Sequence, residues 1–324
     1  RSVCGRIPRT LAASCGATLF AHDLSVLRGG HASPDGGWAD GRLRGDDGIR
    51  SVDTAAGDDR SVIVLSEDEV DRRLTPALAR AAVERALVAA ADGSGRLNPV
   101  VIGAGLADGQ SYSIKSGAAL RDDLVGLKVG SYWPGAERFG LSRHGSSVLL
   151  LDAATGRLRA VVQASRMNGP RTAAANAAAA QRLARQDATT LAVLGAGHQA
   201  PHEIRALCAI RSITRILLWS RTTERASALR DALAAESLPP IEVASAERCC
   251  RAADILVTVT NARAPLFDAD WVGPGTHVAA MGADQAGKQE LPIALLERAS
   301  LFCDLPSQST VIGEFQHVRG AVES

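Results

Sequence analysis

From residue 190 onward, short apolar runs alternate with stretches in which apolar residues recur every three or four positions. The runs have the length and β-branched content of buried strands, and the stretches between them have the period of amphipathic helices. Strands are expected at 190–197, 215–220, 241–245, 254–260, 276–282 and 301–304, and helices at 202–210, 224–235, 246–253 and 293–300. This alternation predicts an α/β fold built on a doubly wound parallel sheet.

The segment before this region combines one long helix with several strands and does not alternate regularly. The helix, 74–93, has Thr75 as its expected cap, Pro76 in its first turn and Gly93 at its exit. Strands are expected at 62–65, 111–117, 126–133, 146–152 and 158–165, and an alanine-rich helix at 170–186. Residues 61–186 are therefore expected to form a smaller α+β domain that ends in a linking helix.

Residues 1–60 match neither pattern. They hold ten of the 31 glycines, eight arginines and eight aspartates, and apolar residues show little periodicity there. Such a segment buries too little apolar surface to offset the entropy lost on ordering it. We expect residues 1–60 to be a disordered or non-native extension.

The composition narrows the class of function. The chain has 324 residues, 46% of them hydrophobic, which is enough for two domains with their own cores. Its net charge of +1, without a basic stretch, argues against nucleic acid and membrane surfaces as partners. No apolar run reaches the roughly 18 residues of a spanning helix, and the six cysteines lack the spacing of metal ligands. We expect a cytoplasmic protein that binds a small molecule and no metal ion.

A glycine motif marks the turn after the first strand of the alternating region. In VLGAGHQA, Gly195-x-Gly197-x-x-Ala200 lies between a strand and a helix. The first glycine makes the tight turn, the second admits a pyrophosphate, and the small third residue lets the helix pack closely on the strand. The phosphates would bind amides at the helix N-terminus. This context predicts a Rossmann-type dinucleotide-binding domain, with a glycine-rich turn of another α/β sheet as the alternative.

The second strand ends in Ser220-Arg221-Thr222, where such a domain places the residue that reads the adenosine ribose. A carboxylate there would bond the 2′-hydroxyl of NAD, whereas serine and arginine suit a 2′-phosphate. NADP(H) is therefore favoured over NAD(H). The alternative is an exposed arginine that merely leads into the next helix.

Further candidates follow the later strands, because ligands of an open parallel sheet bind at the carboxyl ends of its strands. Thr258 and Thr260 are small hydroxyl residues that would let the chain pass close under a dinucleotide; the alternative is a loop that is merely rich in turn-forming residues. In AAMGADQAGKQEL, Met281 and Gly282 end a strand, and Asp284 follows where a nicotinamide would lie. Asp284 is either a proton-transfer group or one more aspartate in a turn.

Lysine is rare in this chain. Of the 36 basic residues only Lys115, Lys128 and Lys288 are lysines. Where arginine serves as the general cation, a retained lysine indicates a position that needs a compact ammonium group. All three lie in motif-bearing segments, so we interpret them as functional and take chance survival as the alternative.

Six motifs, in this order, resemble the ornithine cyclodeaminase/mu-crystallin family: GLKVGSYWPG, LLLDAATGRLRAVV, RTAAANAAAAQRLAR, LAVLGAGHQA, ILLWSRT and AAMGADQAGKQEL. The resemblance covers about residues 62–317. It implies a substrate and dimerisation domain at 61–186 and a Rossmann domain at 187–324. Family members continue beyond the last residue of this chain, so the second domain is expected to be C-terminally truncated. A homodimer is expected if the chain is complete.

The resemblance also assigns roles to residues. It places Lys128 and Arg171 at the substrate carboxylate, and Asp284 at the catalytic acidic position that faces the reacting nitrogen. The residues that would hold the dinucleotide are Gly195, Ala196, Gly197, His198, Gln199 and Arg221. Hydride transfer at an α-carbon needs a carboxylate fixed by cations and an acid or base at the nitrogen, so these roles are chemically reasonable.

Two departures from the family pattern affect the expected substrate and cofactor. Lys115 replaces a glutamate-containing stretch of the ornithine-acting members, and Ser220-Arg221 replaces an acidic ribose reader. We therefore expect an NAD(P)(H)-dependent enzyme that acts at the Cα–N bond of a small amino or imino acid, with Lys115 among its substrate-binding residues. One alternative is redox-neutral conversion of ornithine to proline and ammonia. Another is a non-catalytic, crystallin-like NADPH-binding protein or an inactive fragment.

Overall fold

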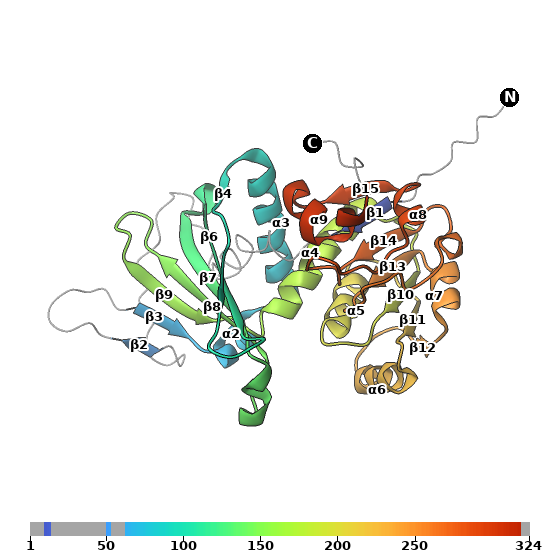
Figure 1. Ribbon diagram of the computed structural model, residues 1–324, viewed down its shortest axis with the longest axis horizontal. Helices are drawn as coiled ribbons and strands as arrows, with labels where there is room; N and C mark the ends of the chain where they lie inside the picture. Colours follow the sequence, from blue (N-terminus) through green and yellow to red (C-terminus); the bar gives the residue numbers. More distant parts are fainter. Residues whose placement is uncertain (1–9, 14–49, 53–61, 319–324) are drawn as a thin grey trace. The chain divides into compact units, whose positions relative to one another are not determined.

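A computed structural model describes residues 10–13, 50–52 and 62–318 (Figure 1). The described residues form two compact units, which divide between Arg171 and Thr172. This point lies inside helix α4 (Asn168–Leu183), the helix predicted as the link. Most of the extension predicted at 1–60 lies outside the described residues.

The later unit contains a parallel sheet of seven strands in the order β12-β11-β10-β13-β14-β1-β15. The strands are β1 (Thr10–Ala13), β10 (Thr190–Leu194), β11 (Arg215–Trp219), β12 (Ile241–Val243), β13 (Ile255–Thr258), β14 (His277–Ala280) and β15 (Ser300–Cys303). Every neighbouring pair in this sheet is parallel. The predicted doubly wound, Rossmann-type fold is confirmed. The sequence did not indicate β1, which lies between β14 and β15.

Helices cover both faces of this sheet. They are α4, α5 (Ala200–Cys208), α6 (Thr223–Leu233), α7 (Ala246–Ala252), α8 (Ile293–Leu296) and α9 (Pro306–Ile312), with 3₁₀ turns η3 (Ala269–Trp271) and η4 (Glu314–His317). Successive side chains of a strand point to opposite faces. Leu191 and Val193 accordingly pack with α4, α5 and α6, whereas Ala192 and Leu194 pack with α7, α8 and η4. Two separate cores thus fix the strand ends that carry the predicted site.

The earlier unit is an eight-stranded sheet in the order β2-β3-β9-β8-β7-β6-β4, with β5 paired to β6. Its strands are β2 (Arg50–Val52), β3 (Val62–Leu65), β4 (Gly95–Leu97), β5 (Val101–Ala104), β6 (Ser111–Ala119), β7 (Leu124–Tyr132), β8 (His144–Leu151) and β9 (Leu158–Gln163). Its helices are α2 (Glu67–Arg73) and α3 (Pro76–Asp92), with 3₁₀ turns η1 (Leu120–Asp122) and η2 (Pro134–Phe139). The pairing is antiparallel except between β3 and β9. This is the α+β arrangement expected from the irregular pattern.

Helix α3 begins and ends at the predicted residues. The Thr75 side chain accepts a hydrogen bond from the Leu78 amide, Pro76 occupies the first turn, and Gly93 takes a left-handed conformation with φ of 77°. Ala82 of this helix is fully buried and packs in one cluster with Val148 and Val162 of the sheet. The helix therefore covers the face of the sheet on which these valines lie.

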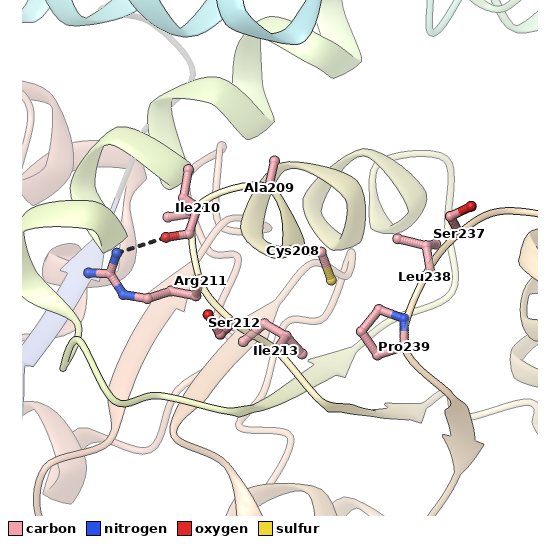
Figure 2. A pocket seen from close by; sticks show the side chains of 9 residues that line it. All are labelled: Cys208, Ala209, Ile210, Arg211, Ser212, Ile213, Ser237, Leu238 and Pro239. Atoms are coloured by element: carbon pink, nitrogen blue, oxygen red, sulfur yellow. Dashed lines mark hydrogen bonds between the residues drawn. The ribbon is translucent and has the colours of Figure 1, made fainter.

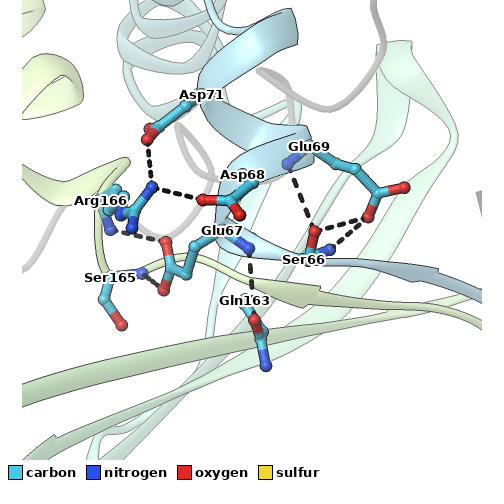
Figure 3. A network of polar contacts seen from close by, with 8 residues as sticks. All are labelled: Ser66, Glu67, Asp68, Glu69, Asp71, Gln163, Ser165 and Arg166. Atoms are coloured by element: carbon cyan, nitrogen blue, oxygen red, sulfur yellow. Dashed lines mark hydrogen bonds and ion pairs between the residues drawn. The ribbon is translucent and has the colours of Figure 1, made fainter. Parts of the chain in front are cut away.

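Glu67, in the first turn of α2, joins this helix to the segment that precedes α4 (Figure 3). Its Oε1 accepts a hydrogen bond of 2.7 Å from the Ser165 amide, and its Oε2 accepts one of 2.9 Å from the Arg166 amide. The Arg166 guanidinium also pairs with Asp68 and Asp71 of the same helix, at 2.7 Å each. These contacts hold the backbone that leads to Arg171.

Within the described part of the chain, no helix combines the length and the apolar character needed to cross a membrane. The cytoplasmic location expected from the sequence stays a prediction.

Candidate functional site

The carboxyl ends of four neighbouring strands, β10, β11, β13 and β14, lie in register. Leu194 at the end of β10 is opposite Trp219 of β11 and Thr258 of β13, and Thr258 is opposite Ala280 of β14. The turns that follow these strands therefore lie side by side at one edge of the sheet. They contain or directly adjoin Gly195, Ala196, Gly197, His198, Gln199, Ser220, Arg221, Thr222, Thr258, Thr260, Met281, Gly282 and Asp284. The structure thus gathers every candidate of this unit at the edge where open sheets bind ligands.

The glycine turn has the geometry that the motif requires. Gly195 has φ of +130°, and a Cβ there would lie 2.5 Å from the Val259 carbonyl oxygen, so a larger residue does not fit. A Cβ at Gly197 would meet nothing within 4 Å, and this glycine is exposed. Ala200, at the start of α5, is fully buried. The turn is therefore closed where it packs on the sheet and open where a pyrophosphate would approach.

A buried carboxyl lies in the helix behind the glycine turn. Glu203 is fully buried, and it accepts hydrogen bonds from the side-chain amides of Asn176, at 2.7 Å, and Gln199, at 2.8 Å. Burial raises the pKa of Glu203 to about 7, although both hydrogen bonds act in the opposite direction. The side chain of Gln199 is thus bound to this carboxyl. Its predicted contact with the dinucleotide stays a prediction.

The predicted ribose-reading residues adjoin the glycine turn. The Gly195 amide donates a 2.8 Å hydrogen bond to the carbonyl of Trp219, the residue before Ser220. Ser220 is half-buried, and its Oγ accepts a 3.4 Å hydrogen bond from the amide of Thr222, which caps α6. Arg221 is exposed. Arg221 lies two residues after Trp219, whose carbonyl binds the turn that would hold the pyrophosphate.

Glu290, which the sequence did not indicate, binds three of the predicted residues together. Its Oε1 accepts hydrogen bonds from the amide and hydroxyl of Thr260, at 2.6 and 2.7 Å. Its Oε2 accepts from the Thr258 hydroxyl and the Gly282 amide, at 2.8 Å each. Burial raises the pKa of this fully buried carboxyl, and the four hydrogen bonds oppose that rise. Glu290 therefore fixes the turns after β13 and β14 to each other.

Asp284 lies in a loop that an ion pair closes. Its Oδ1 is 2.5 Å from the Nζ of Lys288, four residues later. The Asp284 side chain is 54% exposed, whereas that of Lys288 is 10% exposed. A reactive carboxylate needs access to a ligand and a defined orientation, and this arrangement supplies both. The rarity of lysine marks Lys288 as a functional position in the sequence, but the sequence alone assigns it no specific role.

The predicted substrate residues lie in the other unit. Lys115 of β6 and Lys128 of β7 are direct cross-strand partners, and both are half-buried. Lys128 is in turn opposite Val148 of β8, so the two ammonium-bearing side chains start from the helix-covered face of the sheet. Met167 packs with Val148 in the same cluster, and its carbonyl accepts a hydrogen bond from the amide of Arg171. Arg171 is 4% exposed, and its Nη2 donates to Oδ1 of Asn168.

A pocket of about 740 Å³ lies in the later unit, between the segments that lead into β11 and β12 (Figure 2). It is lined by Cys208, Ala209, Ile210, Arg211, Ser212, Ile213, Ser237, Leu238 and Pro239. These residues precede β11 and β12, so the pocket lies at the amino ends of the strands. Ligands of open α/β sheets bind at the opposite edge. We therefore assign this pocket no part in the dinucleotide site.

The described residues contain no cluster of histidine, cysteine, aspartate or glutamate that could hold a metal ion. The later unit instead offers backbone amides and a glycine turn for phosphates, and an accessible carboxylate. The earlier unit carries a group of cations. Together with the fold, these features define a nicotinamide dinucleotide-dependent enzyme with a Rossmann-type domain. The model of the ornithine cyclodeaminase/mu-crystallin family matches residues 60–323. The chain belongs to this family.

Individual relatives agree with this membership. The chain is 36% identical over 260 residues to an iminosuccinate reductase of Paracoccus denitrificans, covering 80% of this chain and 81% of the relative. The crystal structure of that reductase in complex with NAD⁺ covers 81% of this chain and 82% of its own, with a TM-score of 0.77. An alanine dehydrogenase of Archaeoglobus fulgidus is 31% identical over 256 residues, which cover 78% of this chain and 76% of the relative.

A third relative is named as a cyclodeaminase. The L-lysine cyclodeaminase of Streptomyces rapamycinicus is 37% identical over 198 residues, which cover 60% of this chain and 57% of the relative. The family and the enzyme class predicted from the sequence are confirmed.

Proposed function

We propose that this protein reduces a small imino acid that carries a second carboxylate, with NADP(H) as the preferred cofactor, and that it also catalyses the reverse oxidation. The observation that supports this substrate most directly is the Lys115–Lys128 pair. An anionic group that binds between two ammonium groups on directly opposite strand positions is attracted by both of them. The two ammonium groups and the Arg171 guanidinium are three cationic groups, which is more than a single substrate carboxylate needs as partners.

Relatives and chemistry point the same way. The name of the Paracoccus relative, iminosuccinate reductase, denotes an imine with two carboxylates. A distal ammonium group, as in ornithine or lysine, would be repelled by the additional cation at Lys115. The dicarboxylate is therefore preferred over the cyclodeaminase substrates for this chain.

The residues divide the chemistry between them. When bound, the nicotinamide would supply the hydride that reaches the imine carbon. Arg171 holds one carboxylate through its planar, two-pronged guanidinium, and Lys128 adds a point charge. Lys115 binds the second carboxylate. Asp284 gives a proton to the nitrogen as the imine becomes an amine, and takes it back in the reverse direction.

The substrate proposal is tested by following NADPH oxidation with ammonium and either oxaloacetate or pyruvate, which form imines with two and one carboxylates. We expect at least about tenfold higher kcat/KM with oxaloacetate, since one well-placed ion pair is worth more than 1.4 kcal/mol in a partly buried site. Lys115→Gln should abolish this preference. Arg159→Gln is the matched control, because Arg159 pairs with Asp152 beside the turn between β8 and β9, and not with β6 or β7.

Three outcomes would contradict the proposal. Equal rates with both keto acids would show that the enzyme does not recognise a second carboxylate on its substrate. Release of ammonia from ornithine or lysine without net NADPH oxidation would favour cyclodeamination. An Asp284→Asn variant that binds dinucleotide and loses no activity would show that Asp284 is not the acid.

The cofactor preference rests on Ser220 and Arg221, which suit a 2′-phosphate. A thermal shift with NADPH, NADP⁺, NADH and NAD⁺ tests it, since bound ligand stabilises the fold by about 2.7 kcal/mol at a hundred times its Kd. The phosphorylated forms should give the larger shift, and Arg221→Asp should reverse the order. Equal or larger shifts with NAD⁺ in the unchanged protein would contradict the preference, and the solved reductase is itself a complex with NAD⁺.

We expect the active form to be a homodimer that pairs through the substrate unit. Exposed apolar side chains gather on and beside β5: Val101 at 55%, Ile102 at 78% and Leu106 at 106% exposure. Exposed apolar groups of this kind mark protein interfaces. A solved relative is described as an alanine dehydrogenase dimer. Ile102→Asp should shift the mass measured by light scattering from dimer to monomer; a monomeric unchanged protein would contradict the expectation.

A further inference from the structure

The ammonium group of Lys288 is enclosed by three oxygen acceptors. Its Nζ lies 3.0 Å from Oδ1 of Asn261, 3.4 Å from the carbonyl oxygen of Gly282 and 2.5 Å from Oδ1 of Asp284. The residue as a whole is 8% exposed. An ammonium group has three N–H donors, so these contacts engage all of them. Such a site fits a compact ammonium better than the larger, planar guanidinium.

The three acceptors come from different parts of the edge. Asn261 follows β13, Gly282 follows β14, and Asp284 lies in the loop beyond it. Lys288 therefore joins the Asp284 loop to both neighbouring turns. Asp284 is more than half exposed and has little packing of its own to hold it in one rotamer. Its orientation depends on the ion pair.

The backbone around Lys288 is itself held in place by η4. The Gly287 amide donates to Oε1 of Gln316 at 2.8 Å, and Nε2 of Gln316 donates to the Lys288 carbonyl at 3.3 Å. Nε2 of His317 lies 2.8 Å from the same carbonyl oxygen. Two residues later, the Glu290 amide donates to Oε1 of the buried Glu314 at 2.6 Å. The anchor of the Asp284 carboxylate is thus a rigid element, as a site needs.

We propose that Lys288 is a positioning residue: it fixes Asp284 in the orientation that proton transfer requires, by holding Oδ1 and directing the rest of the carboxylate outward. This inference rests on the proposed role of Asp284. It extends that role because it assigns Lys288, one of only three lysines in the chain, to the same reaction. Lys288 would act through Asp284 and would not contact the substrate. Misplacing a catalytic group by about 1 Å costs on the order of 100-fold in rate.

The test compares four variants of the full chain in the NADPH assay. Lys288→Met keeps the length of the side chain and removes the charge, and it should lower kcat by about 10- to 100-fold while KM for NADPH stays within about twofold. Asp284→Asn should lower kcat further. In the double variant, kcat should equal that of Asp284→Asn, because a residue that acts through Asp284 has no effect once the acid is gone. The control, Arg251→Met, breaks an exposed i,i+4 pair with Glu247 and should leave kcat unchanged.

Several results would overturn the inference. Unchanged kcat in Lys288→Met, with Asp284→Asn inactive, would refute the positioning role and leave the role of Asp284 intact. A double variant slower than Asp284→Asn would show that Lys288 acts elsewhere. Full activity of Asp284→Asn would refute the proposed function and, with it, this inference. If Lys288→Met does not unfold cooperatively, Lys288→Arg replaces it: a folded variant with lowered kcat supports the proposal, and one with unchanged kcat overturns it.

Discussion

Replacing Glu203 with glutamine should change how the stability of the protein depends on pH. This carboxyl is fully buried in α5 and accepts hydrogen bonds only of the amide type, from Asn176 and Gln199. Burial raises its pKa from 4.5 to about 7, against the effect of both hydrogen bonds. The folded protein therefore binds a proton at Glu203 that the unfolded chain has already released at pH 6.

The sign and size of the effect follow from this difference. Between pH 4.5 and 7 the folded state binds more protons at Glu203 than the unfolded state does. The free energy of unfolding therefore falls as the pH rises through this window, and it stays low above it. Each pH unit of difference corresponds to 1.36 kcal/mol. A change from 4.5 to about 7 gives a loss of roughly 3 kcal/mol, as an order of magnitude.

Glutamine has nearly the same shape and no charge to lose. The Asn176 amide can turn over to present its oxygen to the new amide, so the variant should fold. Urea unfolding at pH 5, 6, 7 and 8 measures the effect. The wild type should lose up to roughly 3 kcal/mol more than Glu203→Gln between pH 5 and 8. Glu314, whose pKa burial also raises to about 7, is present in both proteins and cancels in the comparison.

Glu236→Gln serves as the control. Its hydrogen bond with Arg205 lowers the pKa of Glu236, so this half-buried carboxyl titrates below the window. The slope of stability against pH between 5 and 8 should stay as in the wild type. Parallel curves for the wild type and Glu203→Gln would refute the reasoning, because they would mean that Glu203 ionises alike in the folded and unfolded chain.

Two further substitutions test the framework of the site. Gly282→Ala would place a Cβ 2.3 Å from the Thr260 carbonyl oxygen, so the backbone must shift. We expect the free energy of unfolding to fall by about 1–3 kcal/mol and the thermal shift with NADPH to become smaller. An unchanged melting temperature would contradict the close packing at Gly282. Glu67→Ala removes the acceptor of the Ser165 and Arg166 amides. It should lower the free energy of unfolding, measured with urea, by about 1–3 kcal/mol. A loss below about 0.5 kcal/mol would mean that water replaces the carboxylate as the acceptor.

Local patterns were sufficient to predict much of the fold. Apolar runs and amphipathic stretches identified β10 to β14 because burial of both sheet faces determines their composition. The residues that cap α3 could also be predicted, because capping depends only on residues close in the sequence. The helix expected at 293–300 is shorter in the structure, where α8 covers Ile293–Leu296 and β15 begins at Ser300. A pattern of eight residues could not separate this single turn from the strand that follows.

The candidate site was predictable where it depends on position along a strand. Residues at or just after the end of a strand were located by the rule for parallel sheets, as Thr258 and Gly282 illustrate. The contacts between these residues were not predictable. Glu290 lies 32 positions from Thr258, and its burial becomes evident only when the turns are assembled. The pairing of Lys115 with Lys128 likewise depends on the register of two strands.

The position of β1 has a consequence for biosynthesis. Thr10 pairs with His277 on one side and with Ser300 on the other, so this strand bridges two elements made more than 260 residues later. At about 5–20 residues per second, β1 leaves the ribosome on the order of tens of seconds before its partners exist. Contacts this distant in sequence slow folding, because the loop must close before the pairing stabilises it. Among the described residues, the outer strand β15 pairs with the sheet only through this early segment, so the sheet cannot be completed before residues 300–303 have been synthesised.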